Sequence, residues 1–188
     1  MHDLDHHQHE RSLVSIRRQA LDDHSIQGFV LASGNGLVVL QYVFDFHLDG
    51  LLVLGVDDIS EVRCTATDRF QRDLLAQEGL MQQVPFGAAF DLRGWRSIIE
   101  QLAGEHALMI IECEREEDDA DFVIGRVVQA EESAVFMEHF SGVGRWAAEV
   151  AELPYADITS CQVATNYAKV YERYFARDAH WAASHLEH

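Results

Sequence analysis

The sequence nearly repeats itself, and this restricts the possible fold more than any other feature of the chain. Residues 13–41 align without a gap on residues 110–138, with five identical positions. Apolar residues recur at matching places, and each aligned segment is followed by an Asp-Ile pair and a predicted helix. We therefore interpret the chain as two copies of one small β unit. The identities are Arg18/Arg115, Asp22/Asp119, Gly28/Gly125, Val30/Val127 and Val38/Val135.

Alternating apolar residues and turn signals predict a series of short strands in the first copy. Gly34-Asn35-Gly36 and Asp49-Gly50 are tight-turn signals, because Asn and Gly tolerate a positive φ. Gly28 predicts a bulge or a sharp bend in the second strand. We expect strands over residues 12–19, 26–32, 37–46, 51–55 and 58–65, and a second set from residue 107 to about 163.

Helices are expected between and after the copies. One begins at Thr67 or Asp68, and a second, from Asp91 to Gly104, has an apolar stripe that includes Trp95. A closing helix over residues 166–183 carries aromatic residues, which we expect to dock on the β unit or on a partner. The predicted organisation is a mobile tail (1–11), a first β-barrel copy plus helix (12–80), a connecting loop and helix (81–106), a second β-barrel copy plus C-terminal helix (107–185) and a possible tag remnant (186–188).

The order of these strands resembles a small Sm-like or SH3-like barrel. The residues that carry the resemblance are Ile26-Gln27-Gly28-Phe29-Val30, Leu37–Leu40 and Asp57-Asp58-Ile59-Ser60-Glu61-Val62. The resemblance covers residues 26–65 and, more faintly, 123–163. It implies a bent five-stranded barrel that often oligomerises through strand edges and, in the best-known members, binds uridine-rich RNA. The predicted fold class is mainly β with helices (α+β), as two tandem small Sm-like/SH3-like barrels joined by a helical segment, plus a C-terminal helix.

The RNA-reading positions of that family are only partly present. Sm proteins use an Asp and an Asn around the turn of a first motif and a cation in a second. Here Asn35 lies in the turn, but the strand after it is Leu37-Val38-Val39-Leu40. Asp57, Asp58 and Glu61 occupy the second motif. We therefore take the shape from the resemblance and not the RNA binding.

Charge and apolar content exclude several classes of protein. The chain has 32 acidic and 14 basic residues, and its formal net charge is −18. Such a field repels nucleic acid and anionic membranes. No apolar run approaches the roughly 20 residues of a membrane span, and residues 1–11 do not resemble a signal peptide. Three widely spaced cysteines, Cys64, Cys113 and Cys161, indicate reduced core thiols. We expect a soluble, cytoplasmic protein.

Two groups of residues could carry chemistry. Asp45, His47 and Asp49 alternate, so we expect them to share one strand face, where they could bind a metal or transfer protons. An exposed hairpin face would explain them equally. The tail contains His2, His6, His7 and His9, which could capture Zn²⁺ or Ni²⁺ adventitiously. No phosphate-binding or nucleophile motif is present, and no cofactor is implied.

The sequence therefore favours a non-enzymatic scaffold or protein-interaction protein, with a protein partner or self-association. The first alternative is an Sm-like RNA-binding protein, against which the net charge of −18 counts. The second alternative is a metal-dependent enzyme that uses Asp45, His47 and Asp49.

Overall fold

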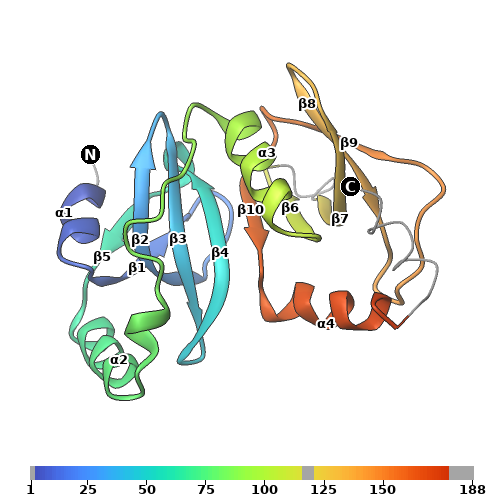
Figure 1. Cartoon of the computed structure of the whole chain (residues 1–188). Helices are drawn as coiled ribbons and strands as arrows, with labels where there is room; N and C mark the ends of the chain where they lie inside the picture. Colours follow the sequence, from blue (N-terminus) through green and yellow to red (C-terminus); the bar gives the residue numbers. More distant parts are fainter. Residues whose placement is uncertain (1–2, 116–120, 178–188) are drawn as a thin grey trace.

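The strands form one continuous antiparallel sheet rather than two barrels. The computed structural model describes residues 3–115 and 121–177. Its ten strands hydrogen-bond in the order β5-β1-β2-β3-β4-β10-β6-β7-β8-β9 (Figure 1). The prediction of two small barrels joined by a helical segment is therefore wrong.

Runs of consecutive strands are separated by short helices and by two 3₁₀ turns (η1 and η2). Their bounds are α1 Leu4–His9, β1 Leu13–Arg17, β2 Ser25–Gly34, β3 Leu37–Phe44, β4 His47–Gly55, η1 Val56–Asp58, β5 Glu61–Arg63, α2 Ala66–Gln77, η2 Leu80–Gln83, α3 Trp95–Glu105, β6 Met109–Cys113, β7 Asp121–Ala130, β8 Ala134–His139, β9 Ala151–Pro154, β10 Ser160–Val163 and α4 Asn166–Phe175. The predicted helix beyond residue 177 and the possible tag remnant lie outside the described residues.

The junction of β4 with β10 explains why the sheet is continuous. Leu51 pairs with Val163 and Leu54 pairs with Ser160, in antiparallel register. An unpaired strand edge leaves N–H and C=O groups without partners, so a neighbouring strand stabilises it. β10 satisfies the edge of β4 on one side and pairs with β6 on the other. Hydrogen bonding therefore crosses from one half of the chain to the other without a break.

The two halves of the sheet have the same internal strand order. In each half the fifth strand pairs with the first, giving β5-β1-β2-β3-β4 and β10-β6-β7-β8-β9. The β2–β3 pairing shifts register between Val30 and Ala32, and the β7–β8 pairing shifts between Val127 and Gln129. These positions are separated by the same interval as Gly28 and Gly125 in the sequence alignment.

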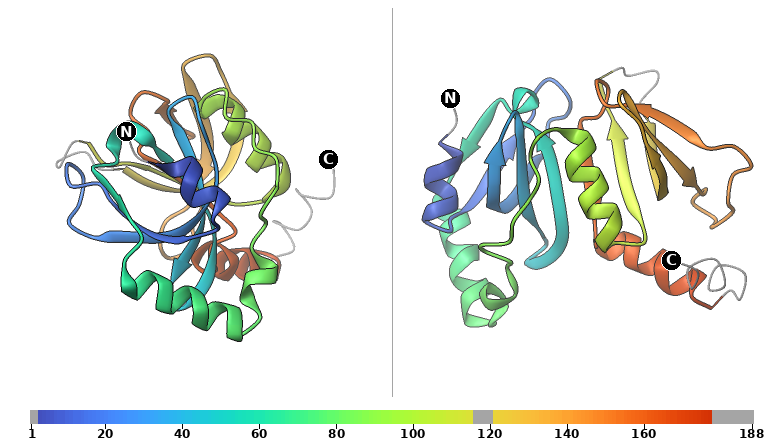
Figure 2. Two further views of the ribbon diagram at one scale, coloured as in Figure 1. Left: turned by 90° about the vertical axis from the view of Figure 1, so that its left-hand side faces the viewer. Right: turned by 45° about the horizontal axis from the view of Figure 1, so that its top comes forward.

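One large core lies across both halves, with α3 packed into it. Ile98, Ile99 and Leu102 of α3 are fully buried together with side chains from both halves, such as Phe29 and Met137. Figures 1 and 2 show α3 next to the junction of the halves. The predicted stripe of this helix is therefore core.

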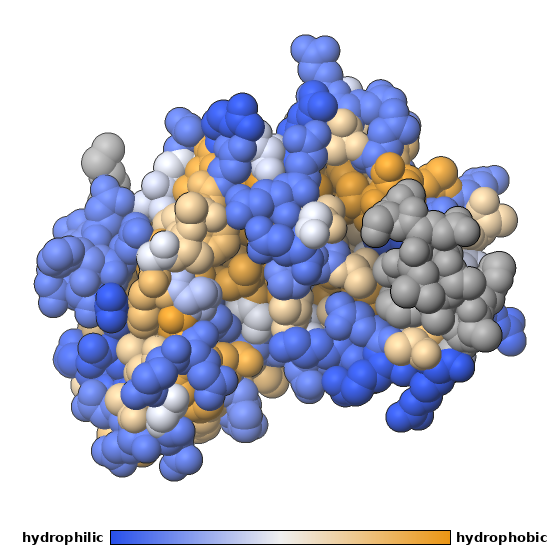
Figure 3. All heavy atoms as spheres, viewed as in Figure 1, coloured by the Kyte–Doolittle hydropathy of each residue, from blue (hydrophilic) through white to orange (hydrophobic). Residues whose placement is uncertain are grey.

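Partly buried apolar side chains complete this core. Trp95, at the first turn of α3, packs against it, as do Phe86 and Leu92 from the segment that joins η2 to α3. That segment forms an apolar band over the first half in Figure 3. We therefore expect Trp95 to contribute less to stability than the fully buried residues of α3.

Residues near the amino-terminal end form a helix where the sequence predicted a mobile tail. Asp3 accepts a hydrogen bond from the His6 amide at 3.2 Å and so caps α1. Leu4 is buried in a cluster with side chains of β1, β2, β3 and β4, and α1 lies against β2. Ser33 Oγ of β2 also donates to Asp5 of α1 at 2.7 Å, so one apolar side chain and a polar contact dock this short helix. Among the described residues, no helix has the length and apolar composition that a bilayer crossing needs.

Asp68 at the start of α2 ties that helix to the sheet. It is fully buried and forms a capping box with Thr65. Its carboxylate also accepts hydrogen bonds from Ser15 Oγ at 2.7 Å and from Gln27 Nε2 at 2.9 Å. Burial alone would raise the pKa of Asp68, but the hydrogen bonds from Thr65, Ser15 and Gln27 outweigh it and lower the pKa.

Replacing Asp68 by Asn should lower the free energy of unfolding by about 2 kcal/mol near neutral pH, since a cap and a buried acceptor are lost. The pKa of Asp68 is lower in the folded than in the unfolded chain. Its stabilisation is therefore present at neutral pH and is lost as the pH falls through the folded pKa. Urea unfolding at about pH 7, 5 and 3 should show a weaker acid dependence for Asp68→Asn than for the unmodified protein. Asp73→Asn, at an exposed position of the same helix, is the control, and an equal acid dependence in both variants would contradict this account.

Candidate functional site

The three candidate residues of the hairpin do not form one row on a strand face. Asp45 and Phe46 make the two-residue turn between β3 and β4, with φ of 45° and 63°. His47 begins β4, and its Nδ1 lies 2.6 Å from the backbone oxygen of Asp45. Asp49 accepts a hydrogen bond from the Asn166 amide at 2.5 Å. The turn was expected at Asp49-Gly50, and this displacement changes which side chains can share a face.

These residues do line one pocket of about 360 Å³. It lies between the β3–β4 hairpin and the start of α4, where Asn166 and Lys169 complete its wall. Lys169 is the only lysine in the chain. The pocket therefore combines two carboxylates and an imidazole with an ammonium group.

Neither the hairpin candidates nor the histidines near the amino-terminal end form a metal site within the described part of the chain. There, no group of three His, Cys, Asp or Glu side chains is close enough to hold a metal ion. His6, His7 and His9 lie on α1, and His2 lies outside the described residues. Burial lowers the pKa of His7, and the neighbouring charge of His6 lowers it further.

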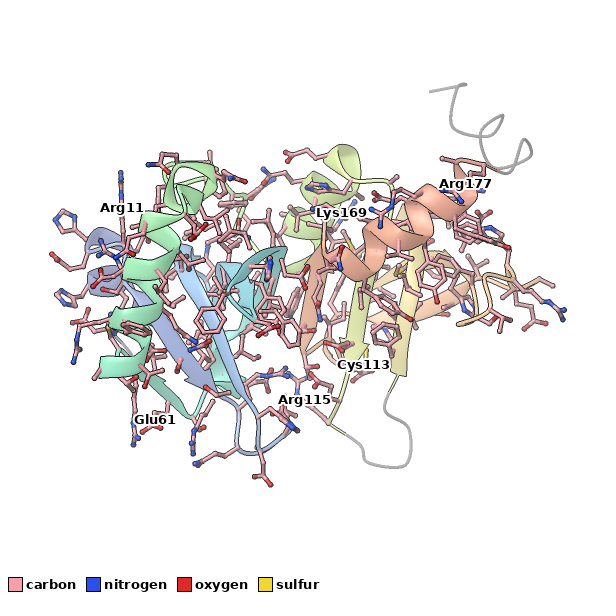
Figure 4. All side chains as sticks on the ribbon, turned by 90° about the horizontal axis from the view of Figure 1, so that it is seen from below. Arg11, Glu61, Cys113, Arg115, Lys169 and Arg177 are labelled. Atoms are coloured by element: carbon pink, nitrogen blue, oxygen red, sulfur yellow. The ribbon has the colours of Figure 1, made fainter. Side chains whose placement is uncertain are left out.

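Two residues at the positions where the Sm family reads RNA, Asn35 and Asp58, make contacts inside this molecule. Asn35, in the turn between β2 and β3, donates from Nδ2 to the backbone oxygen of Leu92 at 2.9 Å. Asp58 forms an ion pair with Arg115 at 2.9 Å, across the two halves. Figure 4 shows Arg115 beside that junction. Cys113 and Cys161 are core residues, and burial raises the pKa of the Cys161 thiol.

Helix α4 docks on the second half through an aromatic cluster. Phe175 is buried, and its ring centroid lies 4.8 Å from that of Phe140 and 5.1 Å from that of Trp146. Tyr171 joins the cluster and donates its hydroxyl to the backbone oxygen of Gly142 at 2.9 Å. Ala168 lies one heptad before Phe175 and is also buried, so these two positions define the docked side.

The same helix has a second apolar stripe, which faces solvent. Tyr167, Val170 and Tyr174 have helical spacing and are 47%, 48% and 55% exposed. Phe122 of β7 contacts Tyr167 edge-to-face at 6.0 Å between centroids, and it is 52% exposed. Val143 lies beside Gly144, whose backbone abuts the Tyr174 ring. We call these five residues, Phe122, Val143, Tyr167, Val170 and Tyr174, the aromatic face.

The cations of α4 lie on its other exposed flank. At 100° per residue, Lys169 and Arg173 project on the side opposite Tyr167 and Tyr174. Figure 4 shows Lys169 near the start of α4 and Arg177 just beyond its far end. None of these three cations has an acidic partner within 4.0 Å in residues 3–115 and 121–177. The helix thus presents aromatic rings beside positive charges that form no ion pair with the described residues.

The two edges of the sheet are poorly suited to strand addition. β5 has three residues, with an ion pair between Glu61 and Arg63. β9 has four residues and ends at Pro154, which has no N–H to donate. Short, charged or proline-bearing edge strands disfavour pairing with another chain. Helix α4 is therefore a better candidate than either edge for contacting a partner.

The sequence predicts a single aromatic stripe on the closing helix, whereas α4 has two apolar stripes in the structure. Two stripes follow from two heptad spacings, 167/174 and 168/175, and only tertiary packing decides which of them is buried. Comparison with family models, with curated proteins and with solved structures gave no match to this chain.

Proposed function

We propose that this chain is a non-enzymatic protein-interaction protein, and that the aromatic face receives its partner. The observation that carries the proposal is the second, solvent-exposed stripe on α4. A surface helix ordinarily has one apolar stripe, and this stripe packs on the core. Here Ala168 and Phe175 are buried on the docked side, whereas Tyr167 and Tyr174 remain about half exposed although they contact Phe122 and the Gly144 backbone.

The size of the face supports the proposal. Three aromatic rings, each about half exposed, leave on the order of 300 Å² of apolar surface in contact with solvent. Patches of that size are among the largest on monomeric proteins and are often binding sites. Tyrosine is also enriched in the central contacts of interfaces, because it buries a large area at a small entropic cost.

The arrangement of the hairpin pocket supports a role other than catalysis. His47 contacts the backbone of its own turn, and Asp49 accepts a hydrogen bond from the Asn166 amide at the start of α4. Both side chains thus have structural partners. A broad screen for hydrolase and phosphatase turnover is the direct check. Robust activity that is abolished by His47→Ala would overturn the non-enzymatic reading.

Site-specific photo-crosslinking should locate the interface. A photoreactive phenylalanine analogue placed at position 174 should give a defined protein adduct in the cells that produce this protein. The same analogue at Arg69, an exposed position of α2, should not. The adduct partner, once purified, should bind the unmodified protein about tenfold more tightly than it binds Tyr167→Ser. Equal adducts at both positions, or equal affinities, would contradict the proposal.

A further inference from the structure

We infer that the partner segment that binds the aromatic face is acidic as well as apolar. The inference rests on the proposed function and adds the chemistry of the partner. It starts from the local charge of α4. Residues 166–177 contain three cations, Lys169, Arg173 and Arg177, and one acid, Glu172, so their net charge is +2 in a chain of net charge −18.

Cations that have no ion pair with a described residue are concentrated around α4. Seven of the 14 basic side chains form ion pairs within the described part of the chain. Four of the remaining seven are Lys169 and Arg173 of α4, Arg177 just after it and Arg145 of the adjoining loop. Acids outnumber bases by more than two to one, so a random arrangement would give most cations an acidic neighbour. In residues 3–115 and 121–177, no carboxylate oxygen lies within 4.0 Å of these four cations.

The geometry places apolar and charged contacts side by side. Tyr167 and Tyr174 lie on one flank of α4, and Lys169 and Arg173 lie on the other, with Val170 between them. Ten helical residues span about 15 Å. A segment of similar length lying along α4 would bury large apolar side chains on the rings and place carboxylates on the cationic flank. Carboxylates so placed would form charge-assisted hydrogen bonds with the arginines.

A peptide fits this surface better than single-stranded nucleic acid does. Nucleic acid carries one charge per nucleotide, and the whole chain would repel it. Asp45 and Asp49 also border the cationic flank where Lys169 lines the hairpin pocket. Moreover, Val143 and Val170 give the face aliphatic contacts that contribute no base stacking. A few carboxylates on an apolar segment face less repulsion than a phosphate backbone.

Selection of random 12-residue peptides displayed on phage, against the full chain, tests the inference. We expect the selected peptides to be enriched in both acidic and large apolar residues over the starting library. A representative peptide, measured by fluorescence anisotropy, should bind about tenfold more weakly to Tyr167→Ser/Tyr174→Ser. It should lose affinity to a similar degree in Lys169→Gln/Arg173→Gln/Arg177→Gln.

The matched control is Arg69→Gln/Arg93→Gln/Arg96→Gln, which removes the same charge from exposed positions of other elements and should leave the affinity unchanged. Selected peptides that need the tyrosines but show no acidic enrichment would overturn this inference and leave the proposed function standing. A selection with no dependence on the tyrosines would overturn both. Tighter binding of a uridine-rich or mixed 15-nucleotide RNA, with a steep salt dependence, would assign the face to nucleic acid instead.

Discussion

Replacing Gly50 by Ala should lower the free energy of unfolding by roughly 2–5 kcal/mol. Gly50 lies in β4 with φ of 78°, a conformation that costs an L-residue about 1–2 kcal/mol. A Cβ at this position would also stand 2.6 Å from the backbone carbon of Ala164 and 2.7 Å from the amide nitrogen of Thr165. Backbone atoms cannot rotate away, and overpacking of this kind costs about 1–3 kcal/mol.

The clash falls where the halves meet, so its effect should extend beyond one hairpin. Gly50 abuts the end of β10 and the residue that caps α4. Moving this backbone would loosen the junction of β4 with β10 and the docking of α4. Gly36→Ala is the matched control, because Gly36 has nearly the same φ, 79°, and no neighbour within 4 Å of its added Cβ. Urea denaturation of both variants separates the cost of the positive φ from the cost of the close backbone approach. An equal loss of unfolding free energy in the two variants would show that the close approach contributes nothing.

Gly50 also shows how far local turn signals predict this fold. The Asn35-Gly36 turn was predicted, and both residues adopt positive φ there. The same turn signal predicts another hairpin turn at Asp49-Gly50. The structure places that turn at Asp45-Phe46 instead and uses Gly50 for a close approach to β10. A glycine signal reports that positive φ is tolerated, and it does not say whether a turn or a neighbouring backbone requires it.

The strands could be predicted locally, but their assembly into one sheet could not. Alternation of apolar residues marks a strand and one of its faces. It carries no information about the partner of an edge strand, and the pairing of Leu54 with Ser160 joins residues more than 100 positions apart. The same limit applies to α4. Its sequence shows two apolar stripes, and only the contact of Phe175 with Phe140 and Trp146 shows which one is docked.

Arg18 connects the two halves through a network that the repeat alignment does not reveal. Its guanidinium donates to both oxygens of Glu114, at 2.6 and 3.0 Å, and to Asp22 at 3.0 Å. Glu114 follows β6 in the second half and also accepts a hydrogen bond from Thr159 at 2.5 Å. Arg18 is only 4% exposed. Burial alone would lower the pKa of Arg18, but the hydrogen bond and charge of Glu114 raise it, so the group remains charged.

Arg18→Gln should therefore lower the free energy of unfolding by about 3–5 kcal/mol, because breaking a buried pair leaves Glu114 without its charged partner. Arg18→Lys should recover only part of this loss, since an ammonium group cannot bind both carboxylate oxygens in the planar geometry of a guanidinium. Urea denaturation followed by tryptophan fluorescence and by circular dichroism gives both the free energy and a test of cooperativity. The two signals should coincide in the unmodified protein, because the halves share one core.

Arg96→Gln, which breaks an exposed pair with Glu100, is the control and should leave the midpoint unchanged. A loss in Arg18→Gln no larger than in this control would show that the junction is held by the β4–β10 pairing and the shared core, and that the ion pair adds little.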